Sequence, residues 1–181
     1  MQNTMIKKLV GSALCMAFCI ILPFFTAGTT LGSVLLPMHF PVFICAYLFG
    51  IWYGMAVGFI SPLLRSVMLG MPVMFPSAIA MSIELCTYAL IVGIFDKVFP
   101  KKRIFVYLSL IIAMVIGRLA WGGTMSIFAG FTNVEFGFQI FIVATLLKAF
   151  PGMILQIVLI PLLVIRIRQN EYKNQIYVNN G

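Results

Sequence analysis

The sequence predicts an all-α membrane protein with six transmembrane helices and both termini on the cytoplasmic side. Hydrophobic residues make up 62% of its 181 residues, charged residues only 9%, and the mean hydropathy is +1.12. These values lie far outside the range of soluble globular proteins. Apolar runs long enough to cross about 30 Å of hydrocarbon recur along the whole length. They leave no room for a soluble catalytic domain.

Prolines, glycines and short polar connections divide the chain into six apolar segments. The first follows Lys7 and Lys8 and is longer than the core of a signal peptide, so we expect it to be a retained spanning helix. We expect residues 1–181 to form a single membrane domain, with helices at about residues 8–25, 41–50, 54–70, 76–95, 104–128 and 138–165.

The second and third helices are delimited by prolines and glycines. Because proline lacks a backbone donor and favours the first helical turn, we expect the second helix to start near Pro41. His39, the only histidine, then lies in the mouth of the bundle, where an interfacial role and a ligand contact are both open. A short turn from Gly50 to Gly54 is expected to follow. Gly54 and Gly58 then give the third helix a GxxxG face for close packing.

The later helices have similar boundaries. The third helix is expected to end at Gly70, and the strongest basic loop, residues 96–103, separates the fourth helix from the fifth. The pair Pro151 and Gly152 is expected to interrupt the sixth helix, because proline removes a backbone donor. We expect the polar tail from Arg166 onward to fray.

The charge distribution predicts the topology. The formal net charge is +8, and lysine and arginine gather near the amino terminus, in the loop 96–103 and in the carboxyl tail. The loops on the other side carry neither, so the positive-inside rule places both termini in the cytoplasm. The excess positive charge is therefore a topology signal, and we expect no nucleic-acid partner.

Four ionised residues interrupt the apolar segments of four different helices: Arg65, Glu84, Arg118 and Lys148. A charge at the bilayer centre costs about 3 kcal/mol even on the mildest insertion scale, so such residues face one another or a watery cavity. Counting from the helix ends places all four in the outer half of the membrane or near its midplane. This arrangement predicts a pocket that opens outward.

Several polar and aromatic residues join these charges as candidates for the pocket. Trp121 lies one turn from Arg118 and sets an aromatic wall beside a cation. The loop 129–137 contributes Asn133. The candidate substrate-binding residues are thus His39, Arg65, Glu84, Arg118, Trp121, Asn133 and Lys148.

Two readings of the charges remain open. In one, Glu84 pairs with a single arginine while the other cations reach the interface or bind lipid phosphates. In the other, the cations line a substrate pocket. Even a paired Glu84 leaves a surplus of two positive charges, which favours an anionic substrate such as a carboxylate. We then expect Arg118→Met or Lys148→Met to weaken binding by more than about 1 kcal/mol with the fold intact.

Catalytic chemistry finds no support in the sequence. It contains no HExxH, GxSxG, paired aspartates or nucleotide-binding loop, so we expect no catalytic residue, no cofactor and no metal. The four cysteines lack CxxC spacing and are expected to be free thiols packed like small hydrophobic residues. Energy for active transport would come from another subunit or an ion gradient.

The first helix carries a small residue repeated at a spacing of four, Ala13 and Ala17. Such a face lets another helix approach closely. Packing within the bundle and docking of a partner helix are both open.

Together these segments resemble the substrate-binding (S) component of energy-coupling factor (ECF) vitamin transporters, a family of small six-helix membrane proteins. The resemblance covers nearly the whole chain. It is carried by the alanine pattern at 13–17, LLPMHFPV at 35–42, the glycine series at 50, 54 and 58, SPLLRSVMLGMP at 61–72 and KAFPGMILQIVLIPLL at 148–163.

The resemblance implies a mechanism. A member of this family captures a vitamin from outside, in the plasma membrane of a bacterial cell. Ala13 and Ala17 would dock onto a transmembrane coupling (T) subunit that is driven by two cytoplasmic ATPase subunits, and the S component would topple in the lipid to release its cargo. The segments 29–39 and 70–72 would gate the site. Besides these subunits, membrane lipid is the expected partner.

The cationic surplus favours pantothenate as the substrate, then folate, whereas pyridoxine or hydroxymethylpyrimidine needs fewer charges. The main alternative is a self-sufficient, proton-coupled secondary transporter with Glu84 as the proton site. The lack of a clear internal repeat weighs against it. A small membrane enzyme or lipid-binding scaffold is a third reading.

Overall fold

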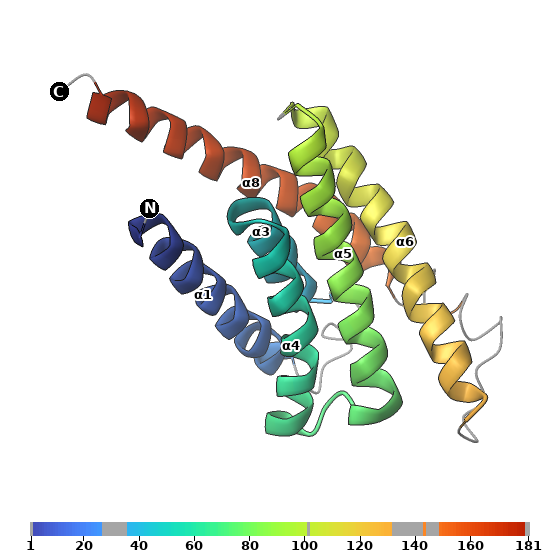
Figure 1. The fold of residues 1–181 in the computed structure, drawn as a ribbon. Helices are drawn as coiled ribbons and strands as arrows, with labels where there is room; N and C mark the ends of the chain where they lie inside the picture. Colours follow the sequence, from blue (N-terminus) through green and yellow to red (C-terminus); the bar gives the residue numbers. More distant parts are fainter. Residues whose placement is uncertain (1, 27–35, 101, 132–142, 144–148, 180–181) are drawn as a thin grey trace.

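A computed structural model describes residues 2–26, 36–100, 102–131, 143 and 149–179. Across these residues the regular structure is helical (Figure 1). The elements are α1 (Gln2–Thr26), α3 (His39–Phe49), α4 (Ile51–Leu69), the short π-helical segment η1 (Met74–Ala78), α5 (Ile79–Val98), α6 (Arg103–Ala129) and α8 (Phe150–Asn179).

The predicted all-helical membrane fold is confirmed, although the number of spans is still a prediction. In the described part of the chain, five segments are long and apolar enough to cross a membrane: Met5–Phe25, Ile51–Leu69, Met74–Val98, Arg103–Ala129 and Phe150–Asn170. The helix α3 has only 11 residues, a length of about 17 Å at 1.5 Å per residue. Of the predicted sixth helix, residues 138–142 and 144–148 lie outside the described residues.

The short helix α3 lies at the centre of the bundle (Figure 1). It packs against α1, α4, α5 and α8, and seven of its residues are buried. An apolar core surrounds α3. The helices α3, α5 and α6 contribute to it, with Val42, Phe43, Leu85, Tyr88, Val92, Leu110 and Met114. Most of α3 is therefore buried against other helices.

The predicted glycine face of α4 is confirmed by two close helix contacts. A Cβ atom placed on Gly54 would lie 2.7 Å from the Cβ of Ala46 in α3. One placed on Gly58 would lie 2.9 Å from the carbonyl oxygen of Leu85 in α5. Both distances are shorter than real Cβ contacts. The two glycines therefore let α4 approach two helices at once.

Two predicted boundaries around α3 are wrong. The helix starts at His39, two residues before Pro41, because the His39 amide donates to the carbonyl oxygen of Leu36 at 3.0 Å. The turn that was expected to cover residues 50–54 consists of Gly50 alone, and α4 begins at the next residue. The φ of Gly50 is 102°, a conformation that glycine adopts readily. The predicted end of α4 is confirmed, since Gly70 caps it in the left-handed conformation, φ 68°.

The final helix differs from its prediction at its carboxyl end. At its other end α8 begins at Phe150 and holds Pro151 and Gly152 in its first turn, so a helix boundary falls where the interruption was expected. A first-turn proline loses no intrahelical hydrogen bond. The tail expected to fray continues as helix to Asn179. In Figure 1, α8 crosses obliquely behind α5 toward the end where the chain terminates.

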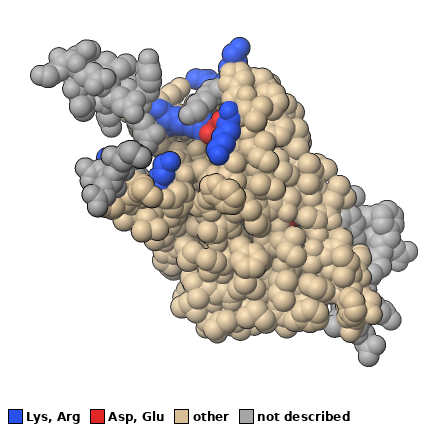
Figure 2. Space-filling view, in the orientation of Figure 1, with Lys and Arg blue, Asp and Glu red and all other residues tan. Residues whose placement is uncertain are grey.

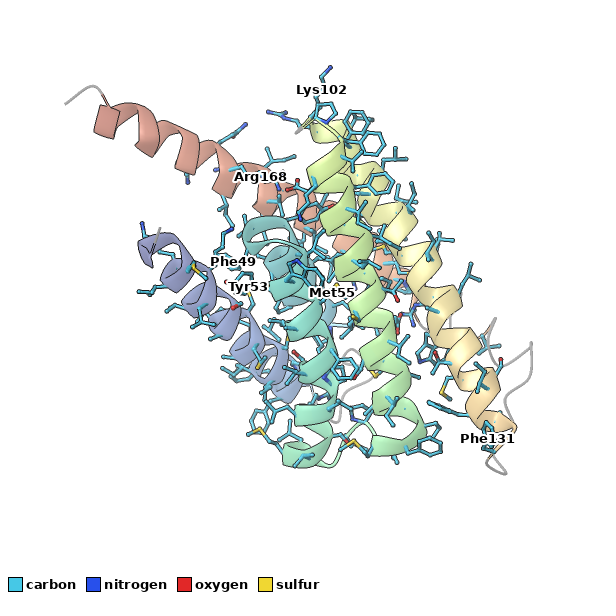
Figure 3. The ribbon with its side chains drawn as sticks, viewed as in Figure 1. Phe49, Tyr53, Met55, Lys102, Phe131 and Arg168 are labelled. Carbon is cyan, nitrogen blue, oxygen red and sulfur yellow. The ribbon has the colours of Figure 1, made fainter. Side chains whose placement is uncertain are left out.

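Basic side chains gather at one end of the molecule. Figure 2 shows them beside acidic groups at one end of a face whose other visible atoms belong almost entirely to uncharged residues. There Arg168 of α8 donates to Asp96 Oδ1 at 2.6 Å and to the carbonyl oxygen of Tyr47 at 2.9 Å, joining α8, α5 and α3. In Figure 3, Arg168 and Lys102 lie at this end, and Phe131 lies at the opposite one. The clustering agrees with the predicted topology, whose orientation in the membrane is still a prediction.

Candidate functional site

The candidate site centres on Glu84 of α5, whose side chain is 1% exposed. Its Oε1 accepts a hydrogen bond from the Tyr88 hydroxyl at 2.5 Å and lies 3.1 Å from Arg118 Nη1 of α6. His39 Nε2, from the first turn of α3, lies 3.9 Å from the same oxygen. Three helices therefore bring one carboxylate together with a guanidinium, a phenol and an imidazole.

Local sequence explains how Tyr88 reaches Glu84. A spacing of four residues places both side chains on one face of α5. The Tyr88 ring stacks on Phe43 with centroids 5.1 Å apart and lies 5.6 Å from the His39 ring. On the α6 side, a Cβ atom at Gly117 would overlap the Tyr88 ring. The glycine at this position makes room for the hydroxyl that holds the carboxylate.

Arg118 is only partly used by this pairing. It is 7% exposed. Its Nη1 faces Glu84, whereas Nε and Nη2 have no hydrogen-bond partner among the described residues. The guanidinium carbon lies 6.0 Å from the centre of the Trp121 ring, a cation–π distance. Both ring nitrogens of His39, which is 1% exposed, also lack a hydrogen-bond partner there. The cluster thus presents several buried polar atoms that no described residue satisfies.

The structure brings together four of the predicted site residues, His39, Glu84, Arg118 and Trp121. Arg65, in the last turns of α4, is partly exposed and has a buried Nε without a hydrogen-bond partner in the described part of the chain. It makes no ion pair with Glu84 there. Asn133 and Lys148 lie outside the described residues, as do residues 29–35 of the expected gate.

Two expectations about the cluster change. His39 is buried within the bundle and does not lie at its mouth, because α3 begins early and packs against α5. Glu84 pairs with Arg118, one of the readings that the sequence left open. Arg118→Met would therefore strand a buried carboxylate, so the expectation of an intact fold no longer holds for this variant.

Tyr88 and Gln156 are among the buried polar residues that sequence reasoning missed. Tyr88 could have been found from its spacing of four from Glu84. Gln156 of α8 is 1% exposed, and its Nε2 has no hydrogen-bond partner among the described residues. The signal for Gln156 was a lone amide within an apolar run.

An apolar groove of about 510 Å³ lies between α1, α3 and α8. Its lining includes Leu14, Phe18, Phe40, Ile44 and Leu159. None of Arg65, Glu84 and Arg118 lines it. The groove is therefore separate from the charged cluster, and its lining does not suit a carboxylate.

The first helix uses one face for internal packing and leaves its small-residue face more open. Ser12, Cys15 and Cys19 are buried, whereas Ala13 is exposed and Ala17 is half-buried. The cysteines are free thiols, as predicted, and the two on α1 pack inward like small hydrophobic residues.

Comparison with known proteins identifies the family. A family model described as "ECF transporter, substrate-specific component" matches residues 7–164, a range that begins in α1, ends in α8 and contains the buried cluster. Neither the curated proteins nor the solved structures give a match. The chain therefore belongs to the family of substrate-specific components of ECF transporters, a family of transporter binding components and not of catalysts.

Proposed function

We propose that this chain is the vitamin-binding subunit of an ECF-type importer in a bacterial plasma membrane. It captures a small, carboxylate-bearing vitamin from outside. Pantothenate is the first candidate and folate the second. Membership of the family supports the transport role, and the geometry of Arg118 supports the choice of an acid.

The observation that carries the choice of an acid is the unused edge of the Arg118 guanidinium. Glu84 occupies Nη1, and the neighbouring donors Nε and Nη2 are buried without a hydrogen-bond partner among the described residues. Buried donors left unpaired cost about 1–3 kcal/mol each. The Nε and Nη2 donors point the same way, so one carboxylate can accept both in a bidentate bond. A substrate acid satisfies this edge without breaking the pair with Glu84.

The remaining predicted residues complete the proposed site. The pair of Glu84 with Arg118 is neutral as a unit, so the charge that attracts an acid comes from Arg65 and Lys148. Trp121 provides an aromatic wall beside Arg118, which it approaches to 6.0 Å. His39 and Asn133 contribute polar contacts in the same proposal.

The proposed partners are a T subunit and two cytoplasmic ATPase subunits, with lipid around the rest of the surface. Ala13 and Ala17 form the docking face. The exposure of Ala13 supports this role, because internal packing of α1 uses other residues. Six spans with both termini in the cytoplasm belong to the same proposal, which the gathering of basic residues at one end supports.

Binding to the purified protein tests the substrate class. Mass spectrometry of the small molecule that co-purifies in detergent identifies the ligand. Equilibrium binding then compares pantothenate with its alcohol analogue, in which a hydroxymethyl group replaces the carboxylate. We expect the acid to bind at least about tenfold more tightly, since a charge-assisted bidentate pair contributes more than about 1.4 kcal/mol. Equal affinity for the two compounds would remove the argument for an acid.

The variant Arg118→Lys sharpens this test. Lysine keeps the charge that pairs with Glu84 but loses the planar fork. We expect it to abolish the preference for the acid while the melting temperature changes little. Arg166→Lys, at an exposed position of α8, is the matched control. Uptake of pantothenate by vesicles that contain this chain alone would instead support the secondary transporter.

A further inference from the structure

We propose that Gln156 of α8 is a further substrate-binding residue, which donates a hydrogen bond to an uncharged oxygen of the substrate while Arg118 binds the carboxylate. The inference rests on the proposed function and extends it to the neutral part of the ligand. It narrows the substrate class to acids that also carry a carbonyl or hydroxyl group away from the carboxylate.

Gln156 places an amide in the buried face of an apolar helix. Gln156 is 1% exposed, and its Nε2 has no hydrogen-bond partner among the described residues. An amide in such surroundings destabilises the protein unless it is hydrogen-bonded, and the few that lack a partner call for a specific explanation. A leucine of similar size would pack there without this penalty. A ligand that accepts the hydrogen bond explains why a glutamine is present.

The face of α8 that carries Gln156 points into the bundle. Gly152, Gln156, Ile160 and Val164 are buried and follow one another at a spacing of four residues, which defines a single helix face. Ile160 and Val164 belong to the apolar core that α3, α5 and α6 share. Gln156 therefore faces the interior of the bundle and not the lipid.

The helices that pack against α8 also carry the charged cluster. These are α3 and α6, which hold His39 and Arg118. Gln156 therefore lies on the buried face of a helix that neighbours both of these residues' helices.

The buried polar atoms of these helices that lack a hydrogen-bond partner in the described part of the chain are mostly donors. Arg118 offers two donors, Gln156 offers one, and the imidazole of His39 has two nitrogens without a hydrogen-bond partner among the described residues. They come from α6, α8 and α3. Such a set suits a ligand with acceptor oxygens at separate positions. A site of this kind rejects analogues that lack the matching group, because its own donors are then left unpaired.

The variant Gln156→Leu tests the inference, with Gln169→Leu at an exposed position of the same helix as the matched control. The melting temperature is measured on ligand-free protein, and affinity is measured with pantothenate and with its alcohol analogue. For Gln156→Leu we expect an unchanged or higher melting temperature, because an unpaired amide is removed. We expect both probes to bind about tenfold more weakly, since one buried hydrogen bond is lost. The preference for the acid should not change, and Gln169→Leu should alter none of these quantities.

The other outcomes decide against the inference in distinguishable ways. A lower melting temperature of the ligand-free variant would show that Gln156 holds the fold together, and unchanged affinity for both probes would show that it does not touch the ligand. Either result overturns the inference and leaves the proposed function standing. Wild-type protein that binds neither probe contradicts the proposed substrate class and this inference with it.

Discussion

Glu84 of α5 and Arg118 of α6 form a buried ion pair in which Oε1 lies 3.1 Å from Nη1. The Tyr88 hydroxyl donates to the same oxygen at 2.5 Å. Only one nitrogen of the guanidinium is used, so the pair compensates the charge of Glu84 and leaves an edge of Arg118 without a hydrogen-bond partner among the described residues. Three of the predictions concern this pair and its surroundings.

Removing one partner of the pair should strongly destabilise the fold. Glu84→Gln leaves Arg118 buried without its counter-ion, and Arg118→Met does the same to Glu84. We expect each to lower the free energy of unfolding by about 3–5 kcal/mol. The double variant should lose clearly less than the sum, because neither charge remains. Denaturant unfolding in mixed micelles measures the free energy of unfolding of the wild type, the two single variants and the double variant, which together form a double-mutant cycle.

The ion pair of Asp96 and Arg168 is the matched control, since both side chains are 20% exposed. We expect Asp96→Asn to lower the free energy of unfolding by about 1 kcal/mol or less. Additive losses in the Glu84 and Arg118 cycle would contradict the pairing.

The hydroxyl of Tyr88 should contribute to stability through Glu84. Tyr88→Phe keeps the ring that stacks on Phe43 but leaves the carboxylate without a hydrogen bond at 2.5 Å. Hydrogen bonds to charged groups contribute about 1.5–3 kcal/mol, so we expect a loss of that size. The melting temperature of Tyr107→Phe, a position that is 38% exposed, provides the control and should not change. Equal melting temperatures for the two variants would argue against the contact.

Room for the Tyr88 ring depends on a glycine of α6. Gly117→Ala adds a methyl group that overlaps the ring, and overpacking of a core costs about 1–3 kcal/mol. Gly123→Ala on the same helix meets nothing within 4 Å. We expect the first variant to lower the melting temperature and the second to keep or raise it, because alanine favours a helix over glycine. If both variants behave alike, the steric explanation fails.

A larger residue on the exposed face of α1 should separate substrate binding from partner docking. Under the proposed function, Ala13→Leu prevents a helix of the T subunit from approaching closely. Affinity for pantothenate should be unchanged, whereas recovery of the coupling subunits in a pull-down should fall at least about tenfold. Ala56→Leu, at an exposed position of α4, is the control. Normal recovery with Ala13→Leu would exclude this face as the docking surface.

Local properties of the sequence predicted much of the fold. Apolar runs and helix-ending glycines are properties of a single segment of sequence. For this reason the sequence correctly predicted the all-helical membrane fold, the end of α4 at Gly70 and the packing face of Gly54 and Gly58. The errors at His39 and Gly50 concern helix starts, where one hydrogen bond or one glycine moves a boundary by a few residues.

The sequence alone also determined that ionised residues in apolar helices belong inside a bundle, because lipid solvates charge poorly. Only the tertiary structure decided which of them meet. Glu84 joins Arg118 and His39 through the packing of α3, α5 and α6, while Arg65 makes no ion pair with it in the described residues. The tertiary structure also showed that Gln156 is buried, because the burial of an amide depends on neighbours that are distant in the chain. Hydropathy is a property of each segment, whereas pairing depends on distances that only the packed helices define.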